Sequence, residues 1–417
     1  MRIALVSEHA NPLAVLGGAD AGGQNVHVDQ LAAGLARRGH DVVVHTRRDG
    51  PDVPQRVRTT SGYVVDHVTA GPPRPLPKDD LLPHMGEMAI RLARQWEAEP
   101  VELVHAHFWM SGLAATDAVR TLSARVPVLQ TFHALGRVKK RHQGAADTSP
   151  RERASLERRL LREVDHVLAT CSDEVAELRE MGLDPGRASV IPCGVDTLVF
   201  RPDVPPAGPA RTRPHRLLAV GRMVPRKGIA TVIESLAHLP SAELLVVGGP
   251  PAGHLDRDPE VRRLREVAAA AGVADRVCLL GGVPSADVPG LLTGSDLLVT
   301  GAWYEPFGIT PVEAMACGVP VVATDVGGHR DTVVPGVTGD LVRPRAAWEM
   351  ARAVRHLLEH DDLRAQYGAA GRRRAEQLYD WSTVVDRTEA VYRAAAGALV
   401  PGYGPTIQRT HEEVTSS

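Results

Sequence analysis

Residues 303–331 read WYEPFGITPVEAMACGVPVVATDVGGHRD. The residues just before them, 296–300 (DLLVT), are mostly apolar and predict a short buried strand. A second apolar run at 320–324 predicts another buried strand, and Gly318 and Pro320 end the helix that lies between the two. Strand, helix and strand in this order form the repeating unit of a parallel α/β sheet.

The start of that helix carries several signals. We expect Thr310 as its N-cap, Pro311 at the first helical position and Glu313 at N3, which together form a capping box. Gly327 and Gly328 follow the second strand. A strand, a glycine loop and a helix N-terminus predict an anion site, because free N–H groups and the helix dipole both favour phosphate.

Two acids, Glu305 and Glu313, bracket the loop, and each has two interpretations. Glu313 either only caps the helix or also binds a ligand, and Glu305 is either a solvated loop acid or a ligand-binding one. The pattern around them, E-x-F-G-x-x-x-x-E-A, resembles the signature of the family-4 retaining glycosyltransferases, which have the GT-B fold. The resemblance implies that Glu305 meets the donor sugar and that Glu313 holds the nucleotide ribose.

The composition limits the class of protein. The chain has 417 residues, which is too long for one ordinary core and suits two domains. Hydrophobic residues make up 43% and charged residues 24%, as in soluble globular proteins. A formal net charge of −2 gives no global basic field, so we expect no nucleic-acid partner. No apolar run approaches membrane-spanning length.

The cysteines and the N-terminus indicate the compartment. Cys171, Cys193, Cys278 and Cys317 show neither a C-x-x-C pair nor metal-ligand spacing, which predicts reduced thiols in a cytoplasmic protein. The first residues, MRIALVSEHANPL, form a strand that runs into a polar loop, so we expect no signal peptide. No Asp-x-Asp motif stands out, and we expect that neither a metal nor another cofactor is required.

Strands and helices alternate along the first half of the chain. A strand at 2–7, a loop at 8–23 and a helix at 24–38 come first, and the loop carries Gly17, Gly18, Gly22 and Gly23. Glycines in front of a helix allow the backbone to approach an anion closely. Further strands are expected at 41–46, 62–68, 101–105, 127–132, 166–170 and 188–192, and helices at 82–97, 112–124 and 151–164.

A linker at 201–214, dense in proline and arginine, separates the halves, and the alternation restarts after it. Two such series predict two facing doubly wound, Rossmann-like parallel sheets with a ligand cleft between them. We assign 1–205 to an acceptor-side domain, 206–382 to a nucleotide-sugar-binding domain and 401–417 to a disordered tail. Residues 345–378 are expected to be helical, and the resemblance implies that a last helix, about 383–400, crosses back onto the first domain.

Two cations stand between a strand and a helix, in Gly221-Arg222 and Lys227-Gly228. Positive charge at a helix start opposes the helix dipole unless an anion lies there, so a phosphate ligand explains the pair better than a surface salt bridge. The pair resembles the family's pyrophosphate-binding Arg/Lys motif, whose fixed cations stabilise the charge that develops on the leaving diphosphate.

Other positions follow from the same resemblance. Gly22 and Gly23 resemble the family's backbone contact to the diphosphate, with a flexible turn as the alternative. His133 ends a strand and is either structural or contacts hydroxyl groups of the donor sugar. The catalytic positions are His133, Arg222, Lys227 and Glu305, with no nucleophile named because no glycosidase-type carboxylate pair is evident. The remaining donor-binding positions are Val283, Phe307, Gly308 and Ile309.

The acceptor side most resembles the D-inositol-3-phosphate glycosyltransferases and the sucrose-phosphate synthases, through GGADAGGQNVHV, HAHFWMSG, TFHALGRVKK and IPCGVD. Asn25 and Lys78 match positions that bind acceptor phosphate in the inositol-phosphate enzymes. Phe108 and Ala134 stand where a tyrosine and a threonine are expected, and both hydroxyl donors are lost. A buried phosphate needs several donors, so we expect a different anionic or sugar acceptor rather than inositol phosphate.

A basic loop at 137–142 follows His133 and includes Lys139 and Lys140. Because the carboxyl ends of strands face the cleft, we expect this loop to border the acceptor pocket together with Phe108 and His133. The loop either attracts an anionic acceptor, such as a sugar or cyclitol phosphate, or is only a solvated basic surface.

The leading hypothesis is a retaining transferase that moves a hexosyl group from a nucleotide-diphosphate sugar to a small acceptor. The donor is expected to be of UDP-glucose or UDP-N-acetylglucosamine type, with ADP- and GDP-sugars left open. The alternatives are a nucleotide-sugar epimerase, a phosphorylase and a non-catalytic sugar-nucleotide binding protein. A phosphorylase needs a lysine for pyridoxal phosphate, and of the four lysines only Lys227 could serve. The oligomeric state, a homodimer included, stays open.

Overall fold

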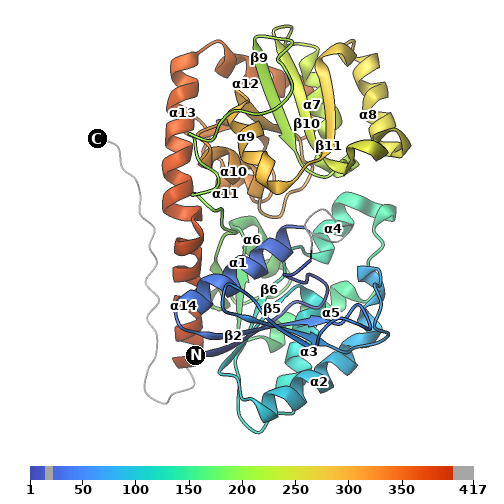
Figure 1. Cartoon of the computed structure of the whole chain (residues 1–417), viewed down its shortest axis with the longest axis vertical. Helices are drawn as coiled ribbons and strands as arrows, with labels where there is room; N and C mark the ends of the chain where they lie inside the picture. Colours follow the sequence, from blue (N-terminus) through green and yellow to red (C-terminus); the bar gives the residue numbers. More distant parts are fainter. Residues whose placement is uncertain (15–21, 398–417) are drawn as a thin grey trace.

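Two parallel sheets organise the chain, which confirms the predicted α/β fold class. The computed structural model describes residues 1–14 and 22–397, so Gly17, Gly18 and the expected tail at 401–417 lie outside the described residues. In Figure 1 each sheet forms the centre of one lobe, and a column of helices runs along one side of both lobes.

The first sheet has the strand order β3-β4-β2-β1-β5-β6-β7-β8, with every pair parallel except β3 and β4. Strands β2, β4 and β3 lie on one side of β1, and strands β5 to β8 lie on the other side. This reversal makes a topological switch point between β1 and β5. The strands are β1 (Arg2–Val6), β2 (Asp41–Arg47), β3 (Arg56–Arg58), β4 (Val64–Val68), β5 (Leu103–His107), β6 (Val128–Thr131), β7 (His166–Ala169) and β8 (Ala188–Val190).

The second sheet has the order β11-β10-β9-β12-β13-β14 and is parallel throughout. Its switch point lies between β9 and β12. The strands are β9 (His215–Val220), β10 (Ala242–Pro251), β11 (Val277–Gly282), β12 (Leu297–Thr300), β13 (Val321–Thr324) and β14 (Gly339–Val342).

Helices cover both faces of each sheet. The helices of the first half are α1 (Gly23–Arg37), α2 (Met85–Ala98), α3 (Trp109–Val119), α4 (Gly136–Gln143), α5 (Arg153–Glu163) and α6 (Ser172–Glu180). Those of the second half are α7 (Ile229–Leu236), α8 (Pro259–Ala270), α9 (Val288–Thr293), α10 (Ile309–Ala316), α11 (His329–Thr332), α12 (Ala347–Leu358), α13 (Asp361–Arg374) and α14 (Trp381–Gly397).

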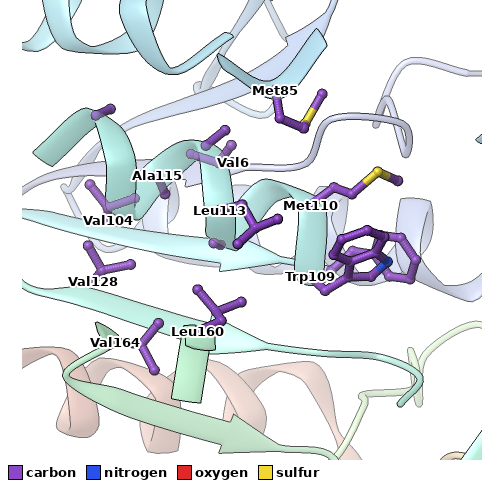
Figure 2. Close-up of a cluster of buried hydrophobic side chains, with 14 of the residues drawn as sticks. Val6, Met85, Val104, Trp109, Met110, Leu113, Ala115, Val128, Leu160 and Val164 are labelled. Atoms are coloured by element: carbon purple, nitrogen blue, oxygen red, sulfur yellow. The ribbon is translucent and has the colours of Figure 1, made fainter. Parts of the chain in front are cut away.

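Alternate residues of the central strands enter different cores, as the twofold period of a strand requires. In β1, Ala4 and Val6 face the core beneath α2, α3 and α5, whereas Ile3 and Leu5 face the core beneath α1 and α14. Figure 2 shows the first of these cores, with side chains of α3 and α5 packed on Val6 and on the neighbouring strands. Both faces are buried, so these strands are apolar throughout rather than alternating.

The last helix, α14, packs on the first lobe although it follows the second in sequence (Figure 1). Trp381 and Tyr392 are buried in the same core as Leu31 of α1. A Cβ atom added to Gly34 of α1 would lie 2.5 Å from Cγ2 of Val385, so the close approach of the two helices depends on this glycine. The helix therefore connects the two lobes physically.

Several predicted elements were wrong in detail. β3 was missed because a three-residue Arg-Val-Arg strand at a sheet edge shows no periodicity. β14 was missed because glycine and aspartate are depleted in strands. The stretch 345–378, expected to be helical, is mostly so, but it is interrupted between α12 and α13, and α13 starts after His360 with an acidic first turn. Aspartates at 361 and 362 were a helix-start signal that the prediction overlooked.

A candidate active site between the two lobes

Two loops meet at the switch point of the second sheet, one after β9 and one after β12. They pack backbone against backbone: a Cβ atom added to Gly228 would lie 1.8 Å from the carbonyl oxygen of Gly301. The contact is possible only with glycine at these positions. It brings Lys227 and Glu305, which are 78 positions apart in the sequence, into direct contact.

Lys227 Nζ donates a hydrogen bond to Glu305 Oε2, and the two side chains are only 20% and 15% exposed. Burial alone would raise the pKa of Glu305, but the charge of Lys227, with smaller contributions from His329 and Arg226, lowers that pKa below its usual range. The carboxyl is therefore ionised at neutral pH. Arg222 lies just beyond the end of β9 and has an exposed side chain.

The helix α10 begins earlier than predicted, so the capping box is wrong. Its N-cap is Gly308, at a φ of 88°, which puts Thr310 and Pro311 at the second and third helical positions. Glu313 consequently lies in the second turn and takes no part in capping. Thr-Pro is a strong local start signal, but the positive φ of Gly308 suits glycine, and a Cβ atom there would lie 2.8 Å from Cδ2 of His329.

Glu313 is half-buried, and its carboxylate makes no hydrogen bond or ion pair within the residues that the structure describes. Burial raises the pKa of Glu313 to about 7. A buried carboxylate without a partner costs stability and is usually found paired or bound to a ligand. The capping-only interpretation is therefore excluded, and Glu313 remains a candidate ligand-binding group.

The other predicted donor-site residues lie at the same edge of the second sheet. Val283 comes directly after β11, and Gly308 and Ile309 begin α10. Phe307 behaves differently, because its ring is buried and lies edge to face with Tyr379 at a centroid distance of 6.0 Å. Only the backbone of Phe307 can therefore face a ligand.

The Gly327-Gly328 loop packs on the Glu305 segment. The N–H of Gly328 donates to the carbonyl oxygen of Glu305 at 2.9 Å, and a Cβ atom on Gly328 would lie 2.1 Å from the carbonyl oxygen of Phe307. The glycines serve close backbone packing, and the helix after them, α11, is a single turn. Because the Gly328 amide is already bonded, the anion site predicted for this loop is not formed by that group.

The glycine loop of the first lobe leads directly into α1. Gly22 is the N-cap and Gly23 the first residue of this helix. The side-chain oxygen of Asn25 accepts from the Gly22 N–H at 3.1 Å, and its amide donates to the carbonyl oxygen of Asn11 at 2.9 Å. Asn25 therefore orders the start of α1 and ties it to the loop after β1.

A narrow pocket between the lobes brings residues of both together. His133, Ala134 and Glu174 line it from the first lobe, and Tyr304 and Glu305 line it from the second. The carboxyl ends of β6 and β12 thus point at a common space. Two of the predicted catalytic residues, His133 and Glu305, share this pocket.

Contacts beside the pocket join the lobes. The ring of Tyr304 stacks on His142 of α4 at a centroid distance of 5.4 Å. At the start of α6, Ser172 donates its N–H at 2.6 Å and its hydroxyl at 2.5 Å to the carboxylate of Asp331. Asp331 therefore stabilises a helix N-terminus of the other lobe, and these contacts hold the 303–331 stretch against the first lobe.

Cations gather around Phe108 on the acceptor side. Lys78 Nζ and Arg153 Cζ each lie 5.1 Å from the centroid of the Phe108 ring, and Arg153 also donates to the carbonyl oxygen of Ala134 at 2.6 Å. Burial is the main cause that lowers the pKa of Lys78; the charges of Asp79 and Glu8 oppose this shift, and those of Lys139 and Arg153 add to it. Like charges collected at one place favour binding of an anion.

The basic segment after His133 is a helix, α4, rather than the predicted loop. Much of its charge is compensated: Arg141 pairs with Glu177 of α6 at 2.5 Å, and Lys139 Nζ lies 2.9 Å from Asp147. These partners come from elsewhere in the chain, which explains why a run of cations with little intrinsic helical periodicity is helical here.

Sequence reasoning missed two residues near the acceptor side. Arg153 stands in an amphipathic charged helix, where an arginine ordinarily faces solvent, yet it is only 3% exposed. His9 lies edge to face on Phe108 at 4.8 Å and is bonded to the buried Glu8 at 2.7 Å. The position of His9 just after β1, at the first switch point, was the signal that could have identified it.

A column of buried histidines lies behind His133. The ring centroids of His105 and His107 are 4.1 Å apart, and those of His27 and His133 are 5.2 Å apart. Burial lowers the pKa of His27 to about 4, and burial together with His27 lowers that of His105 to about 3. The pKa values of His107 and His133 also fall well below the ordinary range, so the column is neutral at pH 7.

This column predicts acid sensitivity. Between pH 6.5 and the folded-state pKa values, the unfolded chain binds more protons than the folded one, so the free energy of unfolding falls as pH decreases. Counting His27 and His105 alone, we expect a loss of about 3 kcal/mol between pH 7.5 and pH 5.5. Urea unfolding at both pH values measures it. His27→Phe, which keeps an aromatic ring, should reduce the loss by about half, and a loss unchanged in that variant would contradict the assignment.

None of the four cysteines forms a disulfide. In residues 1–14 and 22–397, no group of three or more histidine, cysteine, aspartate and glutamate side chains is arranged to hold a metal ion. Within the same part of the chain, no helix combines the length and the apolar character that crossing a membrane requires.

Comparison with known proteins agrees with this geometry. The model described as Glycosyltransferase Family 4 matches residues 21–198, and the one described as Glycosyl transferases group 1 matches residues 201–374. D-inositol 3-phosphate glycosyltransferase of Mycobacterium tuberculosis is 35% identical over 427 residues, covering 100% of this chain and 87% of that relative. The chain belongs to glycosyltransferase family 4.

This family-4 glycosyltransferase is also 34% identical to the D-inositol 3-phosphate glycosyltransferase of Geodermatophilus obscurus, over 95% of its own chain and 90% of the relative. A solved sucrose-phosphate synthase from Thermosynechococcus elongatus matches with a TM-score of 0.83 and 30% identity, over 95% of this chain and 99% of that one. Anabaena HepE, solved with UDP and glucose, shares the fold at a TM-score of 0.71 and 22% identity, over 94% and 99% of the two chains.

Family membership confirms several predictions. The protein is a retaining glycosyltransferase of GT-B fold that uses a nucleotide sugar. Glycosyl transfer is thereby preferred over the epimerase, phosphorylase and non-catalytic alternatives.

Proposed function

We propose that this enzyme transfers a hexosyl group from a UDP-sugar to a small phosphorylated sugar or cyclitol. The observation that carries the proposal is the buried contact of Lys227 with Glu305, beside the same pocket as His133. Lys227 and Arg222 hold the donor diphosphate, Glu313 binds the ribose, and Glu305 and His133 contact the transferred sugar. The backbone of Gly22, Gly23, Val283, Phe307, Gly308 and Ile309 completes the donor site.

The reaction needs no nucleophile from the enzyme in this proposal. The bond between the anomeric carbon and the diphosphate oxygen breaks while the bond to the acceptor oxygen forms on the same face. The acceptor hydroxyl proton passes to the departing diphosphate, whose developing charge Lys227 and Arg222 stabilise.

The choice of uridine as the base rests on a relative. Anabaena HepE is described in complexes with UDP and with UDP-glucose, and it shares the fold of this chain. Donors of UDP-glucose and UDP-N-acetylglucosamine type are therefore proposed first, with ADP- and GDP-sugars as the alternatives.

An anionic acceptor is supported by the cations around Phe108. Lys78 forms no salt bridge within the described residues, and charges of both signs act on it: Asp79 and Glu8 are acidic, whereas Lys139 and Arg153 carry its own charge and are already paired with Asp147 and Glu157. Phe108 and Ala134 offer no side-chain hydroxyl, so charge rather than neutral donors would hold a phosphate there. Lys140 is exposed on α4 and contributes at most long-range attraction.

Product analysis tests the proposal. The purified chain is incubated with UDP-, ADP- and GDP-sugars, each paired with neutral sugars, inositol, hexose phosphates and inositol phosphates. We expect a product only with a UDP-sugar and a phosphorylated acceptor, with the anomeric configuration of the donor retained. Transfer from ADP- or GDP-sugars only would refute uridine as the base of the donor. Turnover of neutral acceptors alone would refute a phosphorylated acceptor.

The acceptor proposal makes a prediction about Lys78. Lys78→Met keeps the length of the side chain and removes its charge, so the acceptor KM should rise by roughly 10- to 150-fold while the donor KM is unchanged, on the scale of a lost charged hydrogen bond. Lys140→Met is the matched control and should change little. In the wild type, the acceptor KM should also rise with ionic strength. If the acceptor KM changes neither with salt nor in Lys78→Met, Lys78 does not bind an anionic acceptor.

A further inference from the structure

One buried histidine near the pocket has no role in the proposed function. His107 ends β5 and is completely buried, and its Nδ1 lies 3.0 Å from Nε2 of His133. His133 itself has a φ of 58°, a left-handed conformation that costs a non-glycine residue free energy. A residue in such a conformation persists only when its surroundings hold it, and His107 is the side chain bonded to it.

The hydrogen bond has a direction that the surroundings fix. Within the described residues, His107 Nε2 is buried and has no hydrogen-bond partner. Buried N–H groups without an acceptor are rarer than buried acceptors without a donor. The single proton of a neutral His107 therefore belongs on Nδ1, from which it is donated to Nε2 of His133. His133 then accepts at Nε2 and must carry its own proton on Nδ1.

Neighbouring groups keep this arrangement in place. Thr131 donates its hydroxyl to the carbonyl oxygen of Leu168 at 2.9 Å, so His105 Nε2 must donate to Thr131. His105 Nδ1 then accepts from the Tyr392 hydroxyl of α14 at 2.6 Å. His105 is thus also a neutral imidazole of defined tautomer, and its ring packs against that of His107. Low pKa values throughout the column keep a second proton off these rings near neutral pH.

We propose that His107 is a positioning residue for His133. By donating Nδ1–H to His133 Nε2, it holds His133 as the Nδ1–H tautomer, whose free N–H is a donor to a hydroxyl oxygen of the transferred sugar in the pocket shared with Glu305. The inference rests on the proposed function for the role of His133 toward the sugar. The tautomer and the hydrogen bond themselves do not depend on it.

Two amide substitutions separate positioning from structure. The amide nitrogen of asparagine sits one bond beyond Cγ, as Nδ1 of histidine does, whereas that of glutamine corresponds to Nε2. His107→Asn should therefore keep the donor to His133 and retain kcat/KM within about threefold. His107→Gln should lose roughly 10- to 100-fold, the scale for removing the hydrogen-bond partner that orients a functional histidine. Affinity for UDP alone, measured by calorimetry, should be the same in both variants and the wild type.

A double mutant provides the second test. Because His107 acts through His133, adding His107→Gln to His133→Ala should cost no further activity. Equal losses in His107→Asn and His107→Gln, or a further loss in the double mutant, would overturn the proposal.

A measurement without turnover distinguishes this inference from the proposed function. Nitrogen-15 NMR of histidine-labelled protein should show His133 as the Nδ1–H tautomer in the wild type and a changed signal in His107→Gln. An Nε2–H tautomer in the wild type would refute the inference even if the enzyme is active. The Nδ1–H tautomer in an enzyme that transfers no sugar would refute the proposed function alone.

Discussion

Replacing Lys227 with alanine should lower kcat/KM by roughly 30- to 800-fold, which corresponds to about 2–4 kcal/mol of transition-state stabilisation. The ammonium group lies at the switch point of the second sheet, is mostly buried, and is held in place by Glu305. A fixed charge that faces a departing diphosphate needs no reorganisation during the reaction, and this preorganisation makes the expected effect large.

The effect of losing the Lys227 charge must be distinguished from the effect of leaving Glu305 without its partner. Removing Lys227 also leaves the Glu305 carboxylate without its ion pair, so the pKa of Glu305 should rise in the variant. Lys227→Arg keeps a charge but not its compact shape and should recover only part of the activity. Lys140→Ala removes an exposed lysine and serves as the control. Kinetics near wild type for Lys227→Ala would refute the assignment, and Arg222→Ala is expected to behave like Lys227→Ala.

The second large effect concerns Glu313, where function and stability should change in opposite directions. Glu313→Gln removes a charged acceptor for ribose hydroxyls, so affinity for UDP should fall by roughly 10- to 150-fold, the scale of hydrogen bonds to charged groups. The same change should raise the melting temperature at pH 8, because an unpaired carboxylate is removed from a half-buried place.

The sign of the stability effect follows from the pKa. Burial raises the pKa of Glu313 from 4.5 to about 7, so the folded state binds more protons than the unfolded state between these values. Protonated Glu313 therefore stabilises the folded state fully below pH 4.5, and this stabilisation is lost as the pH rises through 7. The loss is on the order of 3 kcal/mol. In the wild type, UDP affinity should increase from pH 6 to pH 8, and in Glu313→Gln it should not.

Calorimetry with UDP and thermal unfolding at pH 6 and pH 8 measure both effects. Thr310→Ala is the control for capping: because Gly308 is the N-cap, this change should cost less than the ~1 kcal/mol expected for a lost cap. If Glu313→Gln lowers the melting temperature and leaves UDP affinity unchanged, Glu313 is structural after all.

Local features of the sequence predicted much of the secondary structure. The apolar run before Trp303 became β12, and the run after Gly318 became β13. These predictions succeeded because strand burial and helix breaking depend on residues within about ten positions of one another.

Predictions failed where a distant contact determined the local conformation. The basic segment 137–142 is helical because its cations meet acids of α6 and of the following loop. The start of α3 was placed late because Phe108 itself turns the chain at a φ of 81°, with no glycine to mark the turn. In both cases the conformation depends on interactions that the local hydrophobic pattern does not reveal.

By itself, the sequence determined that the chain is a pair of parallel α/β domains with a glycosyltransferase signature. Only the tertiary structure decided that Lys227 touches Glu305, that Glu313 is half-buried without a partner, and that His107 is bonded to His133. Strand and helix periods are local properties of the chain. Switch points, burial and hydrogen-bond direction instead arise from packing between elements far apart in sequence, and those contacts set the charge and orientation of the side chains that line the pocket.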